Sequence, residues 1–446
     1  MKKISKYNTT IRISSQYGIC YNAVSDKFVL LKSQAYDEMC DGNIENIKQH
    51  YPDLYEQLDA VRAIVDCGVD EVRQVHDVIR AKDNDDTVFH LHVNPTVDCN
   101  FRCWYCYENH VKGSKMQPEM VARVKALMEN ILSTHEHLES FVLSFFGGEP
   151  LMYFNVVTRP LIEHLYASCR EHEVRPYVSF TTNGYLLNRQ MIDFFDEKEV
   201  SFQITLDGDR QRHDKTRFMA TGKGSFDKIV TNIKLLARHG YNVIMRINYT
   251  ADNISSMSSI VDEFADLEQQ YRNRITVDFQ RVWQDIDKAA DEDAVDTEVY
   301  NCIKYFHENG FKVSCAKTSN NVQSTCYGSM RNYALVNYNG DVYQCTARDF
   351  NKANRYGWLT ETGGLVYENG LKEKRESARF SKKVCHDCRI APVCGGGCAQ
   401  KAMELYDATD CVFGYTEEGI RDFVLDRFEY SLLLGEMNGD KCIICR

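Results

Sequence analysis

The sequence predicts an α/β protein whose centre is a partial (β/α)6 TIM barrel, and three features of its middle region support this. Apolar, strand-like stretches alternate with amphipathic helical ones from residue 88 to residue 280. The strand-like stretches are nearly continuous apolar runs, as in parallel sheets that helices cover. Glycine and polar residues follow several of them, at the strand ends where barrel folds build active sites.

The predicted strands are short and span 88–93, 140–146, 177–182, 200–206, 243–249 and 275–280. Helical periodicity between them is clearest at 118–132 and 225–240. The second, third and fourth strands are followed by Gly-Gly-Glu-Pro, Thr-Thr-Asn-Gly and Asp-Gly, which are therefore candidates for the active site. In the fifth strand, Arg246 and Asn248 are expected to point into the barrel mouth, although buried pairing explains them equally well.

The chain divides into three predicted domains, 1–86, 87–300 and 301–446. The first contains a hairpin signal at 18–31, helical periodicity interrupted at Gly42 and Pro52, and a charged linker at 80–86, which fits a small hairpin-plus-helices module. The second is the barrel. The third loses the strand–helix rhythm, has few long elements and is rich in cysteine and glycine, as expected where bound metal replaces a sizeable core.

The net charge of −11 disfavours non-specific binding to nucleic acid or to an anionic membrane surface. The sequence predicts neither a signal peptide nor a membrane-spanning helix, because no stretch reaches eighteen uninterrupted apolar residues, so we expect a cytoplasmic protein. In that compartment its 18 cysteines indicate metal binding rather than disulfides. Isolated cysteines are expected to be small buried hydrophobes, namely Cys20, Cys40, Cys67, Cys169 and Cys302.

Three cysteines, Cys99, Cys103 and Cys106, lie within eight residues after the first predicted strand. A cubane iron–sulfur cluster has four irons that want four ligands. Three thiolates leave one iron open, and an open iron is a binding site for a group that is not protein. Zinc is the competing metal, and the nearby His110 would then serve as a further ligand.

The Cys-x3-Cys-x2-Cys spacing, with an aromatic residue before the last cysteine, resembles the radical S-adenosylmethionine (SAM) enzymes, and further motifs follow in that family's order as far as residue 411. The resemblance implies that the amino and carboxylate groups of SAM chelate the open iron of a [4Fe–4S] cluster. An electron from the cluster would cleave the sulfonium, and the resulting 5′-deoxyadenosyl radical would abstract a substrate hydrogen.

The same resemblance implies a set of residues around the cofactor. Tyr105 is expected against the adenine, with a packing role as its alternative, and the turn after the second strand is expected to hold the methionyl amino group. A hydroxyl residue and a later arginine in the motif of the fourth strand help to bind the cofactor. Asn183 belongs either to this set or to a turn. The implied cofactor-binding residues are Tyr105, Gly147, Gly148, Glu149, Pro150, Asn183, Thr205 and Arg217.

A second cysteine pattern occupies the C-terminal domain. It is similar to the seven-cysteine SPASM extension, which carries two auxiliary clusters in radical SAM enzymes that act on peptides and proteins; a zinc ribbon is the alternative. The resemblance implies a distal cluster on Cys385, Cys388, Cys394 and Cys411. It implies a proximal cluster on Cys326, Cys345 and Cys398. The fourth iron of the proximal cluster takes either a substrate group or Cys315, and the terminal pair Cys442 and Cys445 has no place in the pattern.

Two branches of the family share this layout, the sulfatase maturases and the maturases of ribosomal peptides. Anaerobic sulfatase maturases typically carry an aspartate immediately after the cysteine that follows a glycine step; here Thr346 holds that position and Asp349 is out of register. The N-terminal hairpin resembles a precursor-peptide recognition element, a winged-helix module whose sheet a leader strand extends, with a structural cap over the barrel as the alternative.

The sequence therefore predicts a radical SAM peptide maturase. It would abstract hydrogen from a ribosomal precursor peptide that carries a leader, and install a crosslink or another oxidative modification. It would hold three [4Fe–4S] clusters and receive electrons from a reductant such as flavodoxin or ferredoxin. Two alternatives stay open: an anaerobic sulfatase-maturing enzyme that forms formylglycine, and a non-enzymatic, zinc-containing scaffold that binds peptides.

Overall fold

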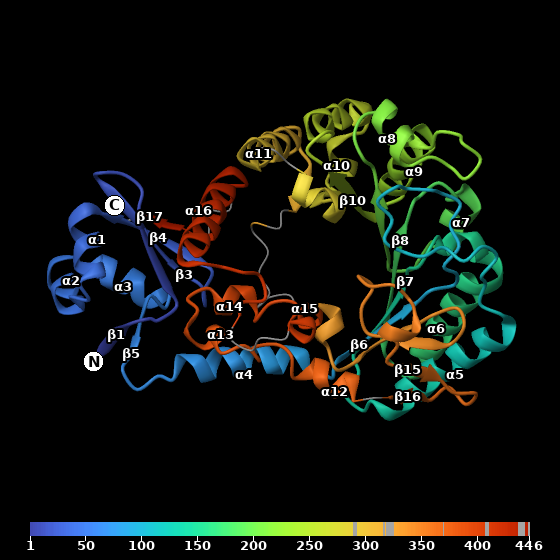
Figure 1. Ribbon diagram of the computed structural model, residues 1–446, viewed down its shortest axis with the longest axis horizontal. Helices are drawn as coiled ribbons and strands as arrows, with labels where there is room; N and C mark the ends of the chain where they lie inside the picture. The colour runs from blue at the N-terminus through green and yellow to red at the C-terminus, as the bar shows by residue number, and fades with distance from the viewer. Residues whose placement is uncertain are drawn as a thin grey trace. The chain divides into compact units, whose positions relative to one another are not determined.

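The computed structural model describes residues 1–288, 292–314, 317, 325–368, 370–405, 410–435 and 442–444. The chain forms two compact units (Figure 1). The barrel unit comprises residues 85–316 and 331–372, and the terminal unit comprises residues 1–84, 317–330 and 373–446. The first boundary between the two units falls after residue 84, next to the predicted domain boundary after residue 86. Residues 331–372, which we predicted to be part of the C-terminal domain, belong to the barrel unit.

A mixed sheet organises the barrel unit, and among the described residues it has eleven strands in the order β12-β11-β10-β9-β8-β7-β6-β13-β14-β15-β16. Seven neighbours run parallel: β6 (Val88–Val93), β7 (Ser140–Phe145), β8 (Arg175–Thr182), β9 (Val200–Thr205), β10 (Asn242–Tyr249), β11 (Ile275–Arg281) and β12 (Lys312–Ser314). The first six of these confirm the six predicted strands and the partial barrel.

Four short strands extend the sheet beyond β6. The first pairs parallel with β6 and the others follow as antiparallel neighbours: β13 (Tyr333–Val336), β14 (Asp341–Tyr343), β15 (Gly357–Leu359) and β16 (Leu365–Tyr367). Gly357 permits this pairing, since a Cβ there would lie 1.8 Å from the carbonyl oxygen of Val366. We did not predict these strands, because runs of three or four residues carry no measurable periodicity.

The two faces of the parallel sheet differ in polarity. Phe145, Phe180 and Phe202 stack across β7, β8 and β9, with ring centroids 5.1 and 5.4 Å apart. Phe195, the residue after α7 (Arg189–Phe194), packs on this face, with its ring centroid 5.5 Å from those of Phe180 and Phe202. On the other face Ser144 and Ser179 approach to 2.6 Å between hydroxyl oxygens. The strands thus alternate between apolar and polar faces, and the expectation of continuous apolar runs is wrong for these positions.

The helices of the barrel unit alternate with its strands. The predicted helices at 118–132 and 225–240 are confirmed by α5 and α9. Between β10 and β11 the chain forms a 3₁₀ segment, η3 (Ile254–Phe264). The helices are α5 (Pro118–Thr134), α6 (Arg159–Glu171), α7 (Arg189–Phe194), α8 (Arg210–Thr216), α9 (Phe226–Arg238), α10 (Gln269–Arg272) and α11 (Glu292–Glu308).

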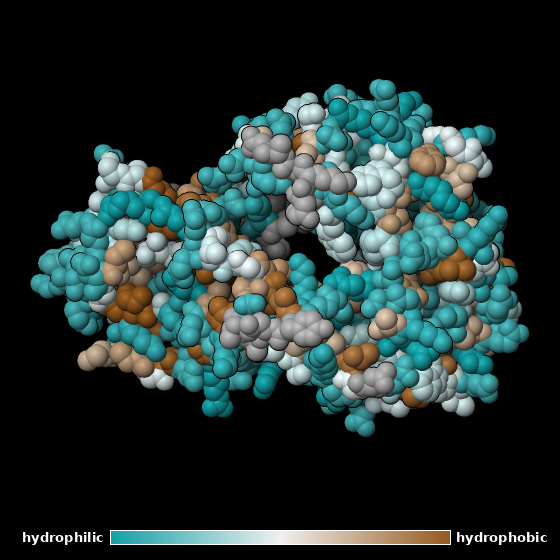
Figure 2. Space-filling view, viewed as in Figure 1, coloured by the Kyte–Doolittle hydropathy of each residue, from teal (hydrophilic) through white to brown (hydrophobic). Residues whose placement is uncertain are grey.

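The terminal unit contains an antiparallel meander of β2 (Asn8–Arg12), β3 (Tyr17–Asn22) and β4 (Lys27–Lys32), and β3 and β4 confirm the predicted hairpin. One face packs on α1 (Ser33–Cys40), α2 (Ile44–His50) and α3 (Pro52–Ala60). Over α1 and α2 the visible surface is mainly hydrophilic (Figure 2), because their apolar residues are buried. The other face packs on α4 (Glu71–Asp83), α14 (Ala391–Cys394) and α16 (Glu417–Leu433).

One expectation for this unit is wrong, because the predicted linker at 80–86 is helical as far as Asp83, the last residue of α4. We expected few long elements after residue 300, and among the described residues α16, with 17 residues, is the one long element that begins there. Its buried positions include Arg427 and Tyr430, so no continuous apolar stripe marks it in the sequence. The remaining elements of this region are α12 (Leu371–Glu376), α13 (Val384–Asp387), α15 (Ala399–Glu404) and β17 (Cys442–Ile444).

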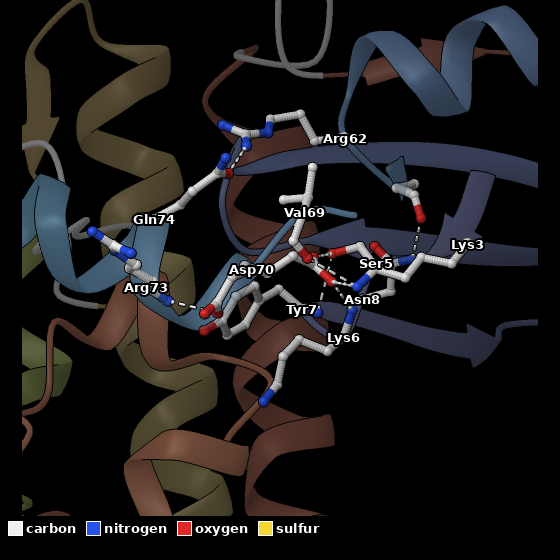
Figure 3. Close-up of polar contacts among 12 residues, drawn as sticks. Lys3, Ser5, Lys6, Tyr7, Asn8, Arg62, Val69, Asp70, Arg73 and Gln74 are labelled. Carbon is white, nitrogen blue, oxygen red and sulfur yellow. Dashed lines mark hydrogen bonds and ion pairs between the residues drawn. The ribbon is translucent and has the colours of Figure 1, made fainter. Parts of the chain in front are cut away.

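The N-terminus is anchored to the start of α4 (Figure 3). β1 (Lys2–Ile4) pairs antiparallel with β5 (Ile64–Asp66). Directly after β1, the Ser5 hydroxyl donates to the buried Glu71 carboxylate, which also accepts from the backbone N of Lys6 at 3.2 Å. These contacts satisfy a buried carboxylate and so fix the first strand against the helix.

A buried ion pair joins the meander to α16. Asp26 sits in the turn between β3 and β4 with φ of +57°, and Arg427 donates to both of its carboxylate oxygens, from Nε at 2.6 Å and from Nη2 at 2.5 Å. The Tyr21 hydroxyl donates to the same carboxylate at 2.9 Å. Arg427 is 1% exposed and Asp26 is 3% exposed. Each charge is therefore neutralised only by protein groups.

Among the described residues, no helix has the length and apolar character that crossing a bilayer requires. The isolated cysteines only partly follow expectation: Cys20, Cys169 and Cys302 are buried, but Cys40 and Cys67 are exposed. Cys315 and Cys445, which the sequence analysis singled out, lie outside the described residues.

Replacing Asp26 by Asn tests the buried ion pair. Asparagine tolerates the positive φ but leaves the guanidinium of Arg427 without its counter-charge, which typically costs about 3–5 kcal/mol. We expect the free energy of unfolding of the terminal unit to fall by this amount in urea denaturation. The double variant Asp26→Asn/Arg427→Met should recover part of the loss. A single variant as stable as the parent chain would contradict this account.

Candidate functional site

A cavity of about 200 Å³ opens at the carboxyl ends of the parallel strands of the barrel unit. Its walls are the loop after β6, the turns after β7 and β8, the ends of β9 and β10, and the segment after β11. Glu149 and Pro150 are buried and do not line it. The predicted residues that do line it are Cys99, Cys103, Tyr105, Cys106, Gly147, Gly148, Asn183, Thr205 and Arg217.

The three cysteines of the loop face this cavity as free thiols. Burial raises the pKa of Cys99 to about 12 and that of Cys106 to about 11, so metal binding must displace their protons. Among the described residues, no three His, Cys, Asp or Glu side chains converge closely enough to hold one metal ion. All three thiols line one cavity, as a cluster of several irons held by three thiolates requires. Nε2 of His110 lies 3.5 Å from Sγ of Cys106.

The glycines after β7 lie against the chain that enters the cysteine loop. Gly147 has φ of +99°, and a Cβ there would lie 2.3 Å from the carbonyl oxygen of Thr96. A Cβ on Gly148 would lie 2.0 Å from the carbonyl oxygen of Asp98. Neither position has room for a side chain, so glycine is required for this backbone contact. The contact fixes the residue that precedes Cys99.

Glu149 connects two strand ends. Its buried carboxylate accepts hydrogen bonds from the backbone N of Leu151 at 3.0 Å, from the Thr182 hydroxyl at 2.7 Å and from the backbone N of Asn183 at 2.8 Å. Burial raises its pKa, and these hydrogen bonds oppose the rise because they favour the carboxylate form. Glu149 thereby ties the turn after β7 to the turn after β8. That this segment contacts a methionyl amino group stays a prediction.

Asn183 connects the turn after β8 to the cysteine loop. Its Nδ2 donates to Oδ1 of Asn100 at 2.7 Å and lies 3.9 Å from Sγ of Cys99. Its Oδ1 accepts from the backbone N of Tyr185 at 3.0 Å. The side chain therefore forms a turn and lines the cavity at the same time, so the two alternatives for Asn183 do not exclude each other.

A polar network forms another wall of the cavity. The Tyr105 hydroxyl donates to Asp207 and accepts from Nη1 of Arg217 at 2.8 Å and from Nδ2 of Asn248 at 3.2 Å. Burial raises the pKa of both Tyr105 and Asp207. Burial alone would lower the pKa of Arg217, but Tyr105, Cys103 and Asp207 raise it overall. Nε of Arg217 is buried without a hydrogen-bond partner among the described residues.

Sequence reasoning missed some residues of this site. Asp207 ends the fourth strand motif, where we noted the Asp-Gly turn but not the carboxylate that holds Tyr105. Tyr107 and Trp283 also line the cavity and stack, with ring centroids 5.7 Å apart. No local spacing could reveal a contact between segments so far apart in the chain. Arg246 and Asn248 line the cavity, as one of the two alternatives predicted.

A second cavity, of about 270 Å³, lies in the terminal unit. Glycines 396 and 397 line it with φ of +78° and +80°, and a Cβ on Gly396 would lie 2.6 Å from the backbone N of Phe380. A side chain at Gly396 would not fit against Phe380, so glycine is required for this backbone contact beside the cavity. The cysteines around it are Cys385, Cys388, Cys394 and Cys411, the set assigned by resemblance to the distal cluster.

The cysteines assigned to the proximal cluster belong to different units of the chain. Cys326 and Cys398 belong to the terminal unit and Cys345 to the barrel unit. Cys398 does not line the second cavity. This ligand set stays a prediction.

Comparison with protein families identifies the domain that holds the first cavity. Residues 93–252 match the Radical SAM superfamily. The chain therefore carries a radical SAM domain and is an enzyme. This rules out the non-enzymatic scaffold. Radical SAM enzymes use SAM and a [4Fe–4S] cluster. The first cavity fits both, because three thiols face it and the unpaired Nε of Arg217 offers a donor for a carboxylate.

Two curated relatives match most of the chain. A cysteine-type anaerobic sulfatase-maturating enzyme of Clostridium novyi (strain NT) is 26% identical over 326 residues, which are 68% of this chain and 85% of that protein. The radical SAM cyclopropyl synthase TigE of Paramaledivibacter caminithermalis is 21% identical over 334 residues, which are 69% of this chain and 67% of that protein.

Solved structures confirm the fold. The structure of anSMEcpe with bound AdoMet and Kp18Cys peptide superposes with a TM-score of 0.60 at 17% identity, and covers 79% of this chain and 100% of that chain. Streptococcus suis SuiB bound to precursor peptide SuiA superposes with a TM-score of 0.50 at 16% identity, and covers 92% of this chain and 99% of that chain.

Replacing Gly148 by Ala tests the backbone contact beneath the cysteine loop. The added methyl group overlaps the carbonyl oxygen of Asp98, so turn and loop must separate. A displacement of this kind costs on the order of a hundredfold in rate, and we expect that loss in SAM cleavage, measured as 5′-deoxyadenosine. Gly68→Ala is the matched control, since a Cβ there meets no atom within 4 Å. A Gly148→Ala enzyme as fast as this control would contradict the account.

Proposed function

We propose that this radical SAM enzyme is a peptide maturase, which abstracts a hydrogen atom from a residue of a ribosomal precursor peptide and installs a crosslink or another oxidative modification. The observation that carries the proposal is the first cavity. There, among the described residues, three thiols and no fourth face the same space as Tyr105 and Arg217.

The residues of this cavity have complementary roles in the proposal. Cys99, Cys103 and Cys106 hold a cluster with one iron left open. When bound there, the cluster and SAM together supply the 5′-deoxyadenosyl radical. Arg217 donates from Nε to an anionic group of the cofactor, a charge-assisted hydrogen bond that its neighbours leave available. Tyr105 presents its ring to the adenine while Asp207 holds its hydroxyl.

Polar groups at the ends of β9 and β10 position the substrate. Gln203, Arg246 and Asn248 line the cavity, and Nε of Arg246 donates to Oδ1 of Asn248 at 3.1 Å. Amide and guanidinium groups of this kind match the backbone of an extended peptide. Tyr107 and Trp283 stack at the same cavity and offer apolar surface to a substrate side chain.

Three observations support a peptide as the substrate. The relatives include enzymes named for sulfatase maturation and cyclopropyl synthesis, and the superposed structures hold a Kp18Cys peptide or the precursor peptide SuiA. The meander and helices of the terminal unit fit the recognition element expected for a leader. The four-cysteine cavity fits an auxiliary cluster of the SPASM type.

Sulfatase maturation is the second candidate, because the relative from Clostridium novyi carries that name. The residue after Cys345 argues against sulfatase maturation. Thr346 occupies the position where an aspartate is expected as the base, and it is 6% exposed. Asp349 lies three residues further along the chain, and its carboxylate accepts from Nδ2 of Asn109 at 3.0 Å. The threonine at the expected aspartate position supports the peptide maturases over sulfatase maturation.

In the complete proposal the enzyme holds three [4Fe–4S] clusters, one in the barrel unit and two on the SPASM cysteines, and a flavodoxin or ferredoxin reduces it. When bound, the auxiliary clusters would offer either an acceptor for the electron that the substrate radical loses or a site for a substrate thiolate. Hydrogen abstraction followed by loss of that electron to a cluster would make the modification a two-electron oxidation.

The decisive experiment coexpresses the enzyme anaerobically with candidate short peptides encoded beside its gene. We expect a mass change in one peptide that depends on SAM and on Cys99, Cys103 and Cys106, and that the triple Cys→Ala variant abolishes. A sulfatase-type peptide should remain unmodified in parallel incubations. Formylglycine in that peptide, with no change in any neighbouring peptide, would replace this proposal by sulfatase maturation.

Cys394→Ala tests the four-cysteine cavity. Because a cubane contains four irons, we expect the reconstituted chain to lose about four irons while it still cleaves SAM without substrate. Peptide modification should be lost. Cys67→Ala, at an exposed and isolated cysteine, is the control. Unchanged iron content in Cys394→Ala would contradict the assignment of this cavity.

A further inference from the structure

The last described residues of the chain form a strand of the N-terminal sheet. β17 (Cys442–Ile444) runs parallel to β4, with Cys442 opposite Phe28 and Ile444 opposite Leu30. The four-stranded sheet therefore has the order β17-β4-β3-β2 among the described residues, and Figure 1 shows β17 beside β4. The sequence pattern assigned no role to this C-terminal segment.

Without β17, β4 would be an edge strand with unpaired backbone N–H and C=O groups. It ends the meander, and both of its faces are already buried. Phe28 packs on Tyr21 and Phe428, with ring centroids 4.7 and 5.2 Å away. Val29 and Leu31 belong to the core that α1, α2 and α3 complete. The backbone groups of the strand edge are then the part of β4 that remains open, and apolar edges of this kind invite pairing with another strand.

β17 covers this edge only weakly. It has three residues, whereas β4 has six from Lys27 to Lys32. It pairs in the parallel sense, which is slightly less stable per residue than antiparallel pairing. The two strands are separated by almost the whole chain, so no tight turn fixes their register. A longer strand that pairs antiparallel would make more hydrogen bonds at the same edge.

The resemblance to a recognition element implies that a leader strand extends this sheet. We propose that the C-terminal strand is a built-in placeholder at the β4 edge, which an extended segment of the precursor peptide must replace. This inference rests on the proposed function and adds a competition to it. Docking by strand addition uses backbone hydrogen bonds and accepts many sequences. The tail sets the threshold that a segment must exceed in order to bind.

The residues of β4 indicate what kind of peptide segment would bind at its edge. An apolar segment suits it, because Phe28, Val29 and Leu31 are buried and Leu30 is partly buried. Lys27 and Lys32 stand at the two ends of the strand. We therefore expect an extended apolar segment of at least five residues, flanked by acidic residues that face these lysines.

The magnitude of the competition follows from the occupancy of the edge. If the tail occupies the edge about 90% of the time, it lowers the apparent affinity of a competing strand about tenfold. Removing the tail should restore this affinity. The barrel cavity contains no residue of the terminal unit, so SAM cleavage without peptide should be unchanged.

The probe for the test is the tail itself. A fluorescein-labelled synthetic peptide of residues 437–446, with serine in place of both cysteines, is titrated into the reconstituted enzyme and followed by anisotropy. The proteins compared are the full chain, a chain that ends at Gly435, and the full-length variant Ile443→Pro, whose fixed φ disfavours an extended strand. Ile443→Val is the matched control. Hydrogen exchange of residues 27–32 is measured on the same samples.

We expect the shortened chain and Ile443→Pro to bind the probe about tenfold more tightly than the full chain and the control. Their β4 amides should exchange faster, and the probe should restore protection. Equal binding and equal exchange in all four proteins would overturn the inference.

A second result separates this inference from the proposed function. Once a modified precursor is known, an unlabelled peptide of its leader should displace the probe from the shortened chain. A precursor that the enzyme modifies but that never displaces the probe would overturn the placeholder role while leaving the maturase function in place. The binding assay requires neither SAM cleavage nor a known product, so the failure of either proposal is visible separately.

Discussion

The contact on which the site depends is the approach of the Gly-Gly-Glu-Pro turn to the chain that enters the cysteine loop. Gly147 and Gly148 leave no room for a Cβ against Thr96 and Asp98. Glu149 then binds the end of β8 through its carboxylate. Three strand ends are thereby held together before any cofactor is present. A cluster bound by the loop is positioned relative to the barrel rather than carried on a free segment.

The remaining walls of the cavity follow from the division of the sheet into two faces. The phenylalanines of β7, β8 and β9 pack toward the helices, so alternate residues of the same strands face inward and are free to be polar. At the ends of β9 and β10 this alternation presents Thr205, Arg246 and Asn248 to the cavity. A buried network around Tyr105 supplies charge and hydrogen bonds where a cofactor with both cationic and anionic groups would lie.

Much of this fold could be predicted from the sequence because the six barrel strands are rich in apolar residues, alternate with amphipathic helices and end in clear turns. β13 to β16 escaped prediction because they are short, and α16 because it buries Arg427 where an apolar residue would be expected. The four cysteines that the resemblance assigned to the distal cluster line the second cavity together, and their role as cluster ligands stays a prediction. Asp207 could not be assigned a role in advance, because its role depends on Tyr105, which the fold brings to it from another part of the chain.

The central claim is that Cys99, Cys103 and Cys106 hold a cluster with an iron open to SAM. It is tested most directly by electron paramagnetic resonance of the dithionite-reduced enzyme, in a variant that lacks the SPASM cysteines and so retains only this site. The account predicts the signal of one reduced [4Fe–4S] cluster whose g-values shift when SAM is added. A cluster signal that SAM leaves unchanged, or no cluster signal at all, would contradict it.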